Sequence, residues 1–168
     1  MEVFKYLGRL LAYNDNNSQA VRGNLKKVRG VWARLSCMIR AENASPHACG
    51  IFYKATVQSI LLFGSKTWNL SPSSLKLLKG FHIRAAWRMT GKRPVKLWDG
   101  TWTYPNSAQV LEDAGLKTVA YYIAVRRQHI ANYIINKPII TTCVKGGRRQ
   151  GSSTRHFWWE QLMDLDAA

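Results

Sequence analysis

The segment 21-VRGNLKKVRGVWARLSCMI-39 sets the helical architecture of this chain. Its apolar residues recur at alternating steps of four and three, which is the period of one face of an α-helix. They are Val21, Leu25, Val28, Trp32, Leu35 and Ile39. The other faces carry Lys and Arg, so the segment predicts a long helix with one buried side and one basic side. We expect Trp32, on the apolar stripe, to pack in the core rather than to contact a ligand.

Two further helices are predicted downstream by their start and stop signals. Ser45-Pro46 and Ser71-Pro72 each combine a serine cap with a proline at the first helical position. Gly64 and Gly91 are expected to end these helices, because glycine accepts the left-handed conformation of a helix C-terminus. His82 falls on the apolar stripe of the third helix, so we expect a packed or hydrogen-bonded histidine rather than a catalytic base.

The other elements are predicted from the same kinds of residues that start and end helices and strands. Residues 3–12 are apolar and aromatic around Gly8, which indicates two short strands meeting at a bend. Later segments predict a loop at 98–105, a short helix at 106–114, a longer helix at 117–136, a linker at 145–153 and an amphipathic piece at 156–165. The predicted fold class is mainly α, with a short N-terminal β-hairpin followed by a helical bundle.

Charge is concentrated in the first half of the chain. Between Asn16 and Trp98 there are fifteen Lys or Arg residues and one acid, Glu42, within a formal net charge of +16. Such an excess favours a polyanion, bound through its phosphate backbone without sequence specificity. We therefore expect RNA, DNA or an RNA–DNA hybrid as the partner. The alternative is a solvated basic face with no ligand.

The contacts are expected to come from basic side chains on the first and third predicted helices and on the segment that follows. These residues are Arg22, Lys26, Arg29, Lys79, Arg84, Arg88, Lys92 and Arg93. We expect each helical trio to lie along one side of its helix and the two trios to form the walls of one groove. Trp87 lies off the apolar stripe, where it could either pack in the core or stack on an unpaired base.

No catalytic or metal site is predicted. The nine acids are scattered, whereas two-metal phosphoryl chemistry needs carboxylates about 4 Å apart around their ions. The histidines stand alone, and Gly146-Gly147 lacks the Lys-Ser/Thr ending of a phosphate loop. We expect no cofactor and no enzymatic activity of the chain on its own.

Cysteine use and hydropathy point to an intracellular protein. Cys37, Cys49 and Cys143 are odd in number and include no close pair, which argues against a disulfide framework or zinc knuckle and predicts buried free thiols. The N-terminal residues show no secretory leader, and no apolar run approaches the about 20 residues of a membrane span. No membrane partner is expected, and the choice between nucleus and cytoplasm stays open.

Three segments carry a family resemblance when they are taken in order. They are FKYLG at 4–8, SILLFGSKTW at 59–68, and the stretch from Phe81 and Arg84 to WRMTG at 87–91. Together they resemble the region after the catalytic palm in reverse transcriptases of non-LTR, LINE-type retrotransposons. That family's pattern runs roughly FKYLG, LLYGSETW and an F-to-R stretch ending in RRI-x-G. This chain differs at Phe63 (usually Tyr), Lys66 (usually Glu) and 86–88 (often Leu-Arg-Arg), and VLEDAGL at 110–116 gives a weaker match to the following linker.

The resemblance implies a division of the chain. Residues 1–14 would be the β-hairpin at the end of a palm, 15–91 a thumb-like basic helical bundle that grips the template-primer, 92–140 a helical linker, and 141–168 a flexible basic segment with a C-terminal amphipathic helix. The family's Tyr-x-Asp-Asp motif is absent and would lie upstream of residue 1, so we expect a start inside a longer ancestral frame.

The missing motif also limits the implied chemistry and partners. Mg²⁺ would serve only a full-length polymerase, and a palm-containing reverse transcriptase chain is a second expected partner. Two alternatives remain: a stand-alone helical RNA- or DNA-binding module, and a structural remnant that binds another protein.

Overall fold

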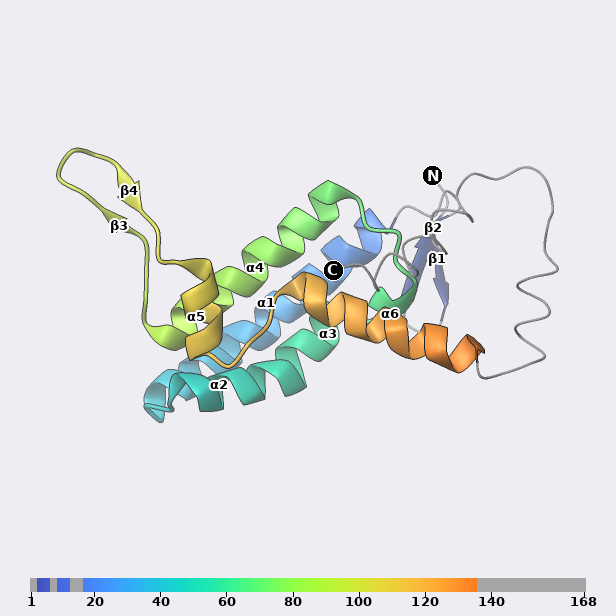
Figure 1. Ribbon diagram of the computed structural model, residues 1–168, viewed down its shortest axis with the longest axis horizontal. Helices are drawn as coiled ribbons and strands as arrows, with labels where there is room; N and C mark the ends of the chain where they lie inside the picture. The colour runs from blue at the N-terminus through green and yellow to red at the C-terminus, as the bar shows by residue number, and fades with distance from the viewer. Residues whose placement is uncertain (1–2, 7–8, 13–16, 136–168) are drawn as a thin grey trace. The chain divides into compact units, whose positions relative to one another are not determined.

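A computed structural model describes residues 3–6, 9–12 and 17–135 (Figure 1). The described residues are mainly helical, which confirms the mainly α part of the predicted fold class. They form two compact units: the described residues up to Phe63 together with Leu70–Val119, and Gly64–Asn69 together with the described residues from Ala120 onward. The predicted segment 141–168, its amphipathic piece and Cys143 lie outside the described residues.

The first unit opens with a two-stranded antiparallel sheet and a long helix. Strand β1 (Val3–Tyr6) pairs with β2 (Arg9–Ala12). Helix α1 (Ser18–Ala41) buries the first four positions of its predicted apolar stripe, from Val21 to Trp32. Trp32 is 7% exposed, and its ring meets that of Tyr53 edge-on at a centroid distance of 5.6 Å. Its predicted place in the core is confirmed.

The second predicted helix is split into three parts. Helix α2 (Pro46–Phe52) begins as predicted, with the Ser45 hydroxyl accepting from the Ala48 N–H at 3.3 Å. It continues through a π-helical segment, η1 (Tyr53–Gln58), into the short α3 (Ser59–Leu61). The amide of Asn24 on α1 donates to the carbonyls of Leu61 and Phe63 at 3.3 and 3.0 Å. This bond pair satisfies carbonyls that the end of a helix leaves without partners.

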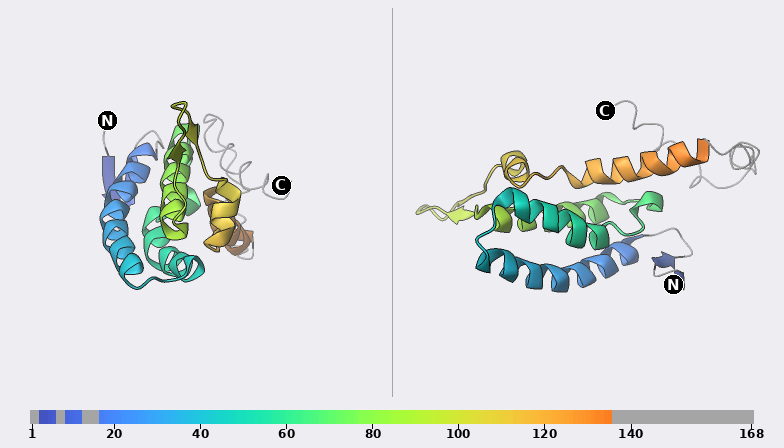
Figure 2. Two further views of the ribbon diagram at one scale, coloured as in Figure 1. Left: turned by 90° about the vertical axis from the view of Figure 1, so that its left-hand side faces the viewer. Right: turned by 90° about the horizontal axis from the view of Figure 1, so that it is seen from below.

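Helix α4 (Pro72–Thr90) lies at the centre of the first unit. Ser71 caps it by accepting from the Ser74 N–H, and Gly91 ends it at φ 70°, both as predicted. It packs against α1 and α2 and against α5 (Ser107–Asp113). A hydroxyl contact of 3.2 Å between Ser18 and Ser74 joins the first turns of α1 and α4. The two helices therefore start together and run in the same direction (Figures 1 and 2).

The predicted loop at 98–105 includes a short strand that the sequence did not predict. Strands β3 (Val95–Lys96) and β4 (Trp102–Thr103) form a β-ribbon, which projects away from the helices in Figure 1. The turn is closed by a hydrogen bond from the Leu97 N–H to the Thr101 carbonyl at 2.8 Å, and Gly100 takes φ 84°. Asp-Gly is a strong hairpin signal, but the two-residue strands are too short to show alternation.

The end of α5 is pressed against α2. Asn106 caps α5 by accepting from the Ala108 N–H, and Gly115 ends it at φ 61°, as the predicted short helix requires. A Cβ added to Gly50 of α2 would lie 1.8 Å from the Ala114 carbonyl oxygen. Glycine at 50 is therefore what allows the two backbones to approach.

His82 is buried within the first unit. Its Nδ1 lies 2.9 Å from the Tyr53 hydroxyl and its Nε2 lies 2.9 Å from the Lys117 carbonyl oxygen. Burial lowers the pKa of the imidazole below its ordinary value, with the Lys117 carbonyl acting in the opposite direction. The predicted packed and hydrogen-bonded histidine is confirmed.

The second unit contains the 3-10 turn η2 (Ser65–Thr67) and most of α6 (Val119–Ile135). The buried guanidinium of Arg127 donates to the Trp68 carbonyl at 2.6 Å, and burial lowers its pKa. No helix within the described ranges is long and apolar enough to cross a bilayer.

The two described cysteines differ in exposure. Cys49 is buried, as predicted, whereas Cys37 is exposed. Five residues separate Cys37 from Trp32, which turns it about 140° around α1 from the buried stripe.

Candidate nucleic-acid interface

All eight predicted contact residues have exposed side chains. Seven of them form no ion pair and no hydrogen bond through their side chains with any residue that the structure describes: Arg22, Lys26, Arg29, Lys79, Arg84, Arg88 and Arg93. Their positive charge is therefore not neutralised within the described part of the protein. Exposed and unpaired, it is available to an anionic ligand.

One hollow lies between the first halves of α1 and α4, and we call it the N-terminal hollow. Arg22 contributes to it from α1, and Lys76 and Arg84 contribute from α4. Gly80 lies between the two α4 residues, and the Arg84 guanidinium reaches within 3.5 Å of the place where a Cβ on Gly80 would stand. The missing side chain leaves room for the guanidinium to lie along the helix.

A second hollow, the C-terminal hollow, follows along the same pair of helices. Its apolar lining includes Trp32, Phe81 and Ala85. Its cations are Arg29 from α1, Arg84 and Arg88 from α4, and Arg93 from the segment after α4. Since both hollows are lined by α1 as well as α4 and share Arg84, we treat them as one feature, the α1–α4 groove. The groove brings together five of the eight predicted residues.

Lys26 and Lys79 do not line the groove, so the expectation of one groove between two intact trios is only partly met. Lys26 lies about 60° around α1 from Arg29, on the side away from the buried stripe. Lys79 and Arg84 are five residues apart, which separates them by about 140° around α4. Lys79 lines another hollow, which it shares with Arg84 but not with Arg88, so no single hollow is lined by the whole α4 trio.

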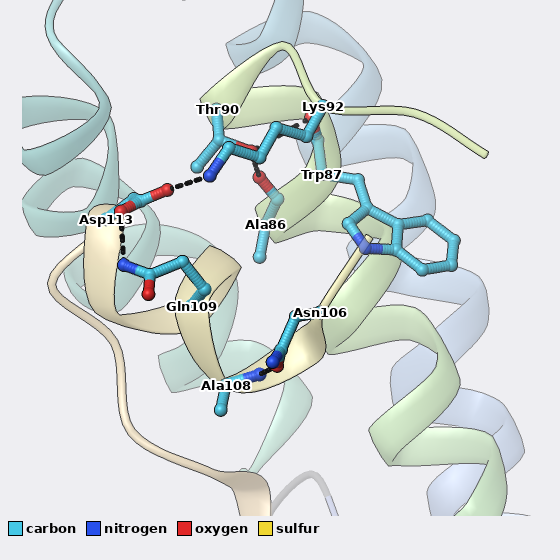
Figure 3. Close-up of polar contacts among 8 residues, drawn as sticks. All are labelled: Ala86, Trp87, Thr90, Lys92, Asn106, Ala108, Gln109 and Asp113. Carbon is cyan, nitrogen blue, oxygen red and sulfur yellow. Dashed lines mark hydrogen bonds and ion pairs between the residues drawn. The ribbon is translucent and has the colours of Figure 1, made fainter. Parts of the chain in front are cut away.

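Lys92 has a partner inside the protein. Its ammonium lies 2.5 Å from an Asp113 carboxylate oxygen at the end of α5, and Gln109 donates to the other oxygen at 3.0 Å (Figure 3). The hydrogen bond from Lys92 has the largest effect on the pKa of Asp113, and that from Gln109 the next largest; both lower it. The Lys92 charge is therefore locally balanced, which makes it the weakest of the predicted contacts.

Sequence reasoning missed two features beside the groove. Lys76 lines the N-terminal hollow, and the row Lys76, Gly80 and Arg84 at steps of four was the available signal. The second feature is an aromatic contact of Trp87, which itself lines the C-terminal hollow: the rings of Trp87 and Tyr104 lie 6.2 Å apart between centroids and 32° from parallel. Together with Lys76, Lys79 and Arg84 they line a third hollow, the α5-side hollow.

The groove has the chemistry of an anion-binding surface. Its polar lining consists of guanidinium, ammonium and hydroxyl groups, which donate hydrogen bonds to phosphate oxygens. Within the ranges that the structure describes, no group of three or more His, Cys, Asp or Glu residues could hold a metal ion.

Comparisons of the chain with protein-family models, with curated proteins and with solved structures found no match. The groove and the sequence motifs therefore provide the grounds for a function.

Proposed function

We propose that this chain binds RNA or DNA duplexes through their phosphate backbone, as the thumb-like part of a non-LTR retrotransposon reverse transcriptase. The observation that carries the binding proposal is the set of five arginines along the α1–α4 groove with no acid paired to them within the described residues. The family proposal is supported by the resemblance of residues 4–91 to the segment that follows the palm.

The arginines fit a phosphate ligand better than a role in folding. Arg84 and Arg88 are four residues apart on one helix, where like charges destabilise the helix slightly. A bound phosphate row would remove this repulsion, because each guanidinium can donate two parallel hydrogen bonds to one phosphate. The repulsion is therefore a cost to the free protein that a bound polyanion offsets.

The groove also fits a partner that is held without regard to base sequence. Contacts to phosphate and sugar position a protein on a duplex but carry no sequence information. A polymerase thumb has this requirement, since it must hold every template and slide along it. We propose that the groove grips the template-primer backbone and that nucleotide transfer belongs to a palm domain.

Two matched double variants test the groove. R84Q/R88Q removes two groove arginines, whereas K27Q/R34Q removes two exposed cations of α1 that line none of the three hollows. We expect R84Q/R88Q to weaken binding to duplexes of unrelated sequence alike. It should also reduce the slope of log affinity against log salt by about 0.9 for each phosphate that the protein no longer neutralises.

The control variant separates a site from general attraction. K27Q/R34Q changes the net charge equally and should alter affinity and salt slope much less. Equal losses in both variants would mean diffuse attraction with no groove, and unchanged binding in both would mean that the basic face is merely solvated. Melting temperatures should stay close to that of the parent, because exposed charges contribute little to stability.

A polymerase assay tests the other half of the proposal. With Mg²⁺, a primer-template and nucleotides, the purified chain should extend no primer. Template-directed extension by clean protein would contradict the assignment of these segments to the region after the palm.

A further inference from the structure

The β3–β4 ribbon exposes an unusual amount of aromatic surface. Trp98 at its turn is 99% exposed, Trp102 on β4 is 56% exposed, and Val95 and Leu97 add apolar surface beside them. Both residues of each strand are exposed, so the ribbon has no covered face. A two-stranded ribbon with no packing partner gains little stability from such residues. Exposed apolar patches of this kind mark interaction sites.

The ribbon begins where the α1–α4 groove ends. Arg93-Pro94, which lead into the ribbon, line the C-terminal hollow. Tyr104, which follows the ribbon, lines the α5-side hollow beside Trp87. The two ends of the ribbon thus adjoin two hollows that share Arg84 and Trp87. A ligand that follows the groove toward the end of α4 would meet the base of the ribbon (Figure 1).

The charges of the ribbon have the same sign as those of the groove. Arg93 and Lys96 are exposed and form no ion pair with a described residue. The one acid, Asp99, accepts from the hydroxyl and the backbone N–H of Thr101 within the turn, and these bonds lower its pKa. Its carboxylate is therefore engaged in holding the turn. The combination of free cations with flat aromatic rings is complementary to a strand of phosphates and bases.

We propose that the β3–β4 ribbon binds unpaired nucleotides that continue from the duplex held in the groove, with bases stacking on Trp98 and Trp102. Stacking suits a sequence-independent holder, since every base has a face that an indole can cover. The inference rests on the proposed function, because it requires that the groove binds the duplex. A protein partner or a membrane surface would also use exposed tryptophans, but neither accounts for the continuity with an arginine-lined groove.

Two nucleic-acid probes isolate the ribbon: a blunt-ended duplex, and the same duplex extended by a short single strand. The parent protein should bind the extended probe more tightly. Trp98→Ala and Trp102→Ala should each remove much of this gain, roughly tenfold in affinity, and leave binding to the blunt duplex unchanged. Trp98→Phe should keep part of the gain, because phenylalanine still offers a flat ring.

A matched aromatic control tests whether any exposed ring would serve. Phe52 on α2 is 57% exposed and lines none of the three hollows, so Phe52→Ala should bind both probes like the parent. Equal losses in Phe52→Ala and Trp98→Ala would overturn the inference. The same holds if the parent binds both probes equally well.

The two probes also separate failure of this inference from failure of the proposed function. Absence of salt-sensitive binding to the blunt duplex would overturn the groove, and with it the inference. Normal binding to the blunt duplex without a gain from the extension would overturn the ribbon alone. Vesicles of phosphatidylcholine with phosphatidylserine provide a third arm: vesicle binding that requires Trp98, without an effect of the extension, would assign the ribbon to a membrane surface and contradict the inference.

Discussion

The α2–α5 contact and the α1–α4 groove are two junctions in one helical unit with opposite chemistry. At the first, Gly50 and Ala114 let two backbones approach closely. At the second, the five arginines surround apolar ring and methyl surface, and no described acid balances them. The first junction contributes stability through close packing, whereas the second leaves charge unsatisfied for a ligand. The comparison predicts that substitutions at the first alter folding, and substitutions at the second alter binding.

The largest effect is expected at Trp32, which belongs to both sides of this comparison because it is buried in the core and lines the groove. Trp32→Ala should lower the free energy of unfolding by about 3–5 kcal/mol, since it opens a large cavity and removes the edge-on contact with Tyr53. Denaturant titration measures this loss. If affinity fell while the unfolding transition stayed in place, Trp32 would instead be a ligand contact.

A pair of glycine substitutions tests the packed junction next. Gly50→Ala should destabilise by about 1–3 kcal/mol or more, because the new methyl group would overlap the Ala114 carbonyl. Gly30→Ala is the control: Gly30 is exposed on α1 with no atom near the new methyl, and alanine there should stabilise the helix by roughly 0.5–1 kcal/mol. Equal thermal shifts in the two variants would contradict the close approach of α2 and α5.

Local signals predicted most of the helices, because each signal acts within one turn of the chain. Ser71-Pro72 and Gly91 gave both ends of α4, and the alternating apolar steps gave the buried face of α1. The π-helical segment at 53–58 carried no such signal, since it contains neither glycine nor proline. The β3–β4 ribbon was missed because two-residue strands show no alternation around Asp99-Gly100.

For the candidate site, the sequence predicted the exposed cations of each helix but not how the helices come together. The charge pattern gave exposed cations on α1 and α4, but their meeting depends on which flank of α4 faces α1. Lys79, five residues before Arg84, lines the α5-side hollow instead of the groove, and Lys76, spaced by fours from Arg84 through Gly80, was not among the predicted contacts. The Lys92–Asp113 pair joins residues that are far apart in sequence and has no local signature.

The smallest effect is expected from pH, and it separates the buried region from the groove most directly. The Lys117 carbonyl can only accept, so the neutral His82 carries its proton on Nε2 and accepts from the Tyr53 hydroxyl at Nδ1. Burial holds its folded-state pKa below the ordinary 6.5, so the unfolded chain binds more protons between the two values. Stability should therefore be full above about pH 6.5 and decline below it, by at most about 1.4 kcal/mol per pH unit.

Duplex affinity of the folded protein should not follow this decline, because arginine stays charged throughout the range. Thermal melting and binding between about pH 7.5 and pH 5.5 measure the two quantities side by side. His82→Gln should lose the pH dependence of melting that the imidazole causes. The Asp113 carboxyl does not interfere, since its pKa is lowered from 3.8 and its contribution is lost only in more acidic solution. A slope that persists in His82→Gln would place the titrating group elsewhere, and an affinity that falls in parallel with stability would show that groove and core are coupled rather than separate.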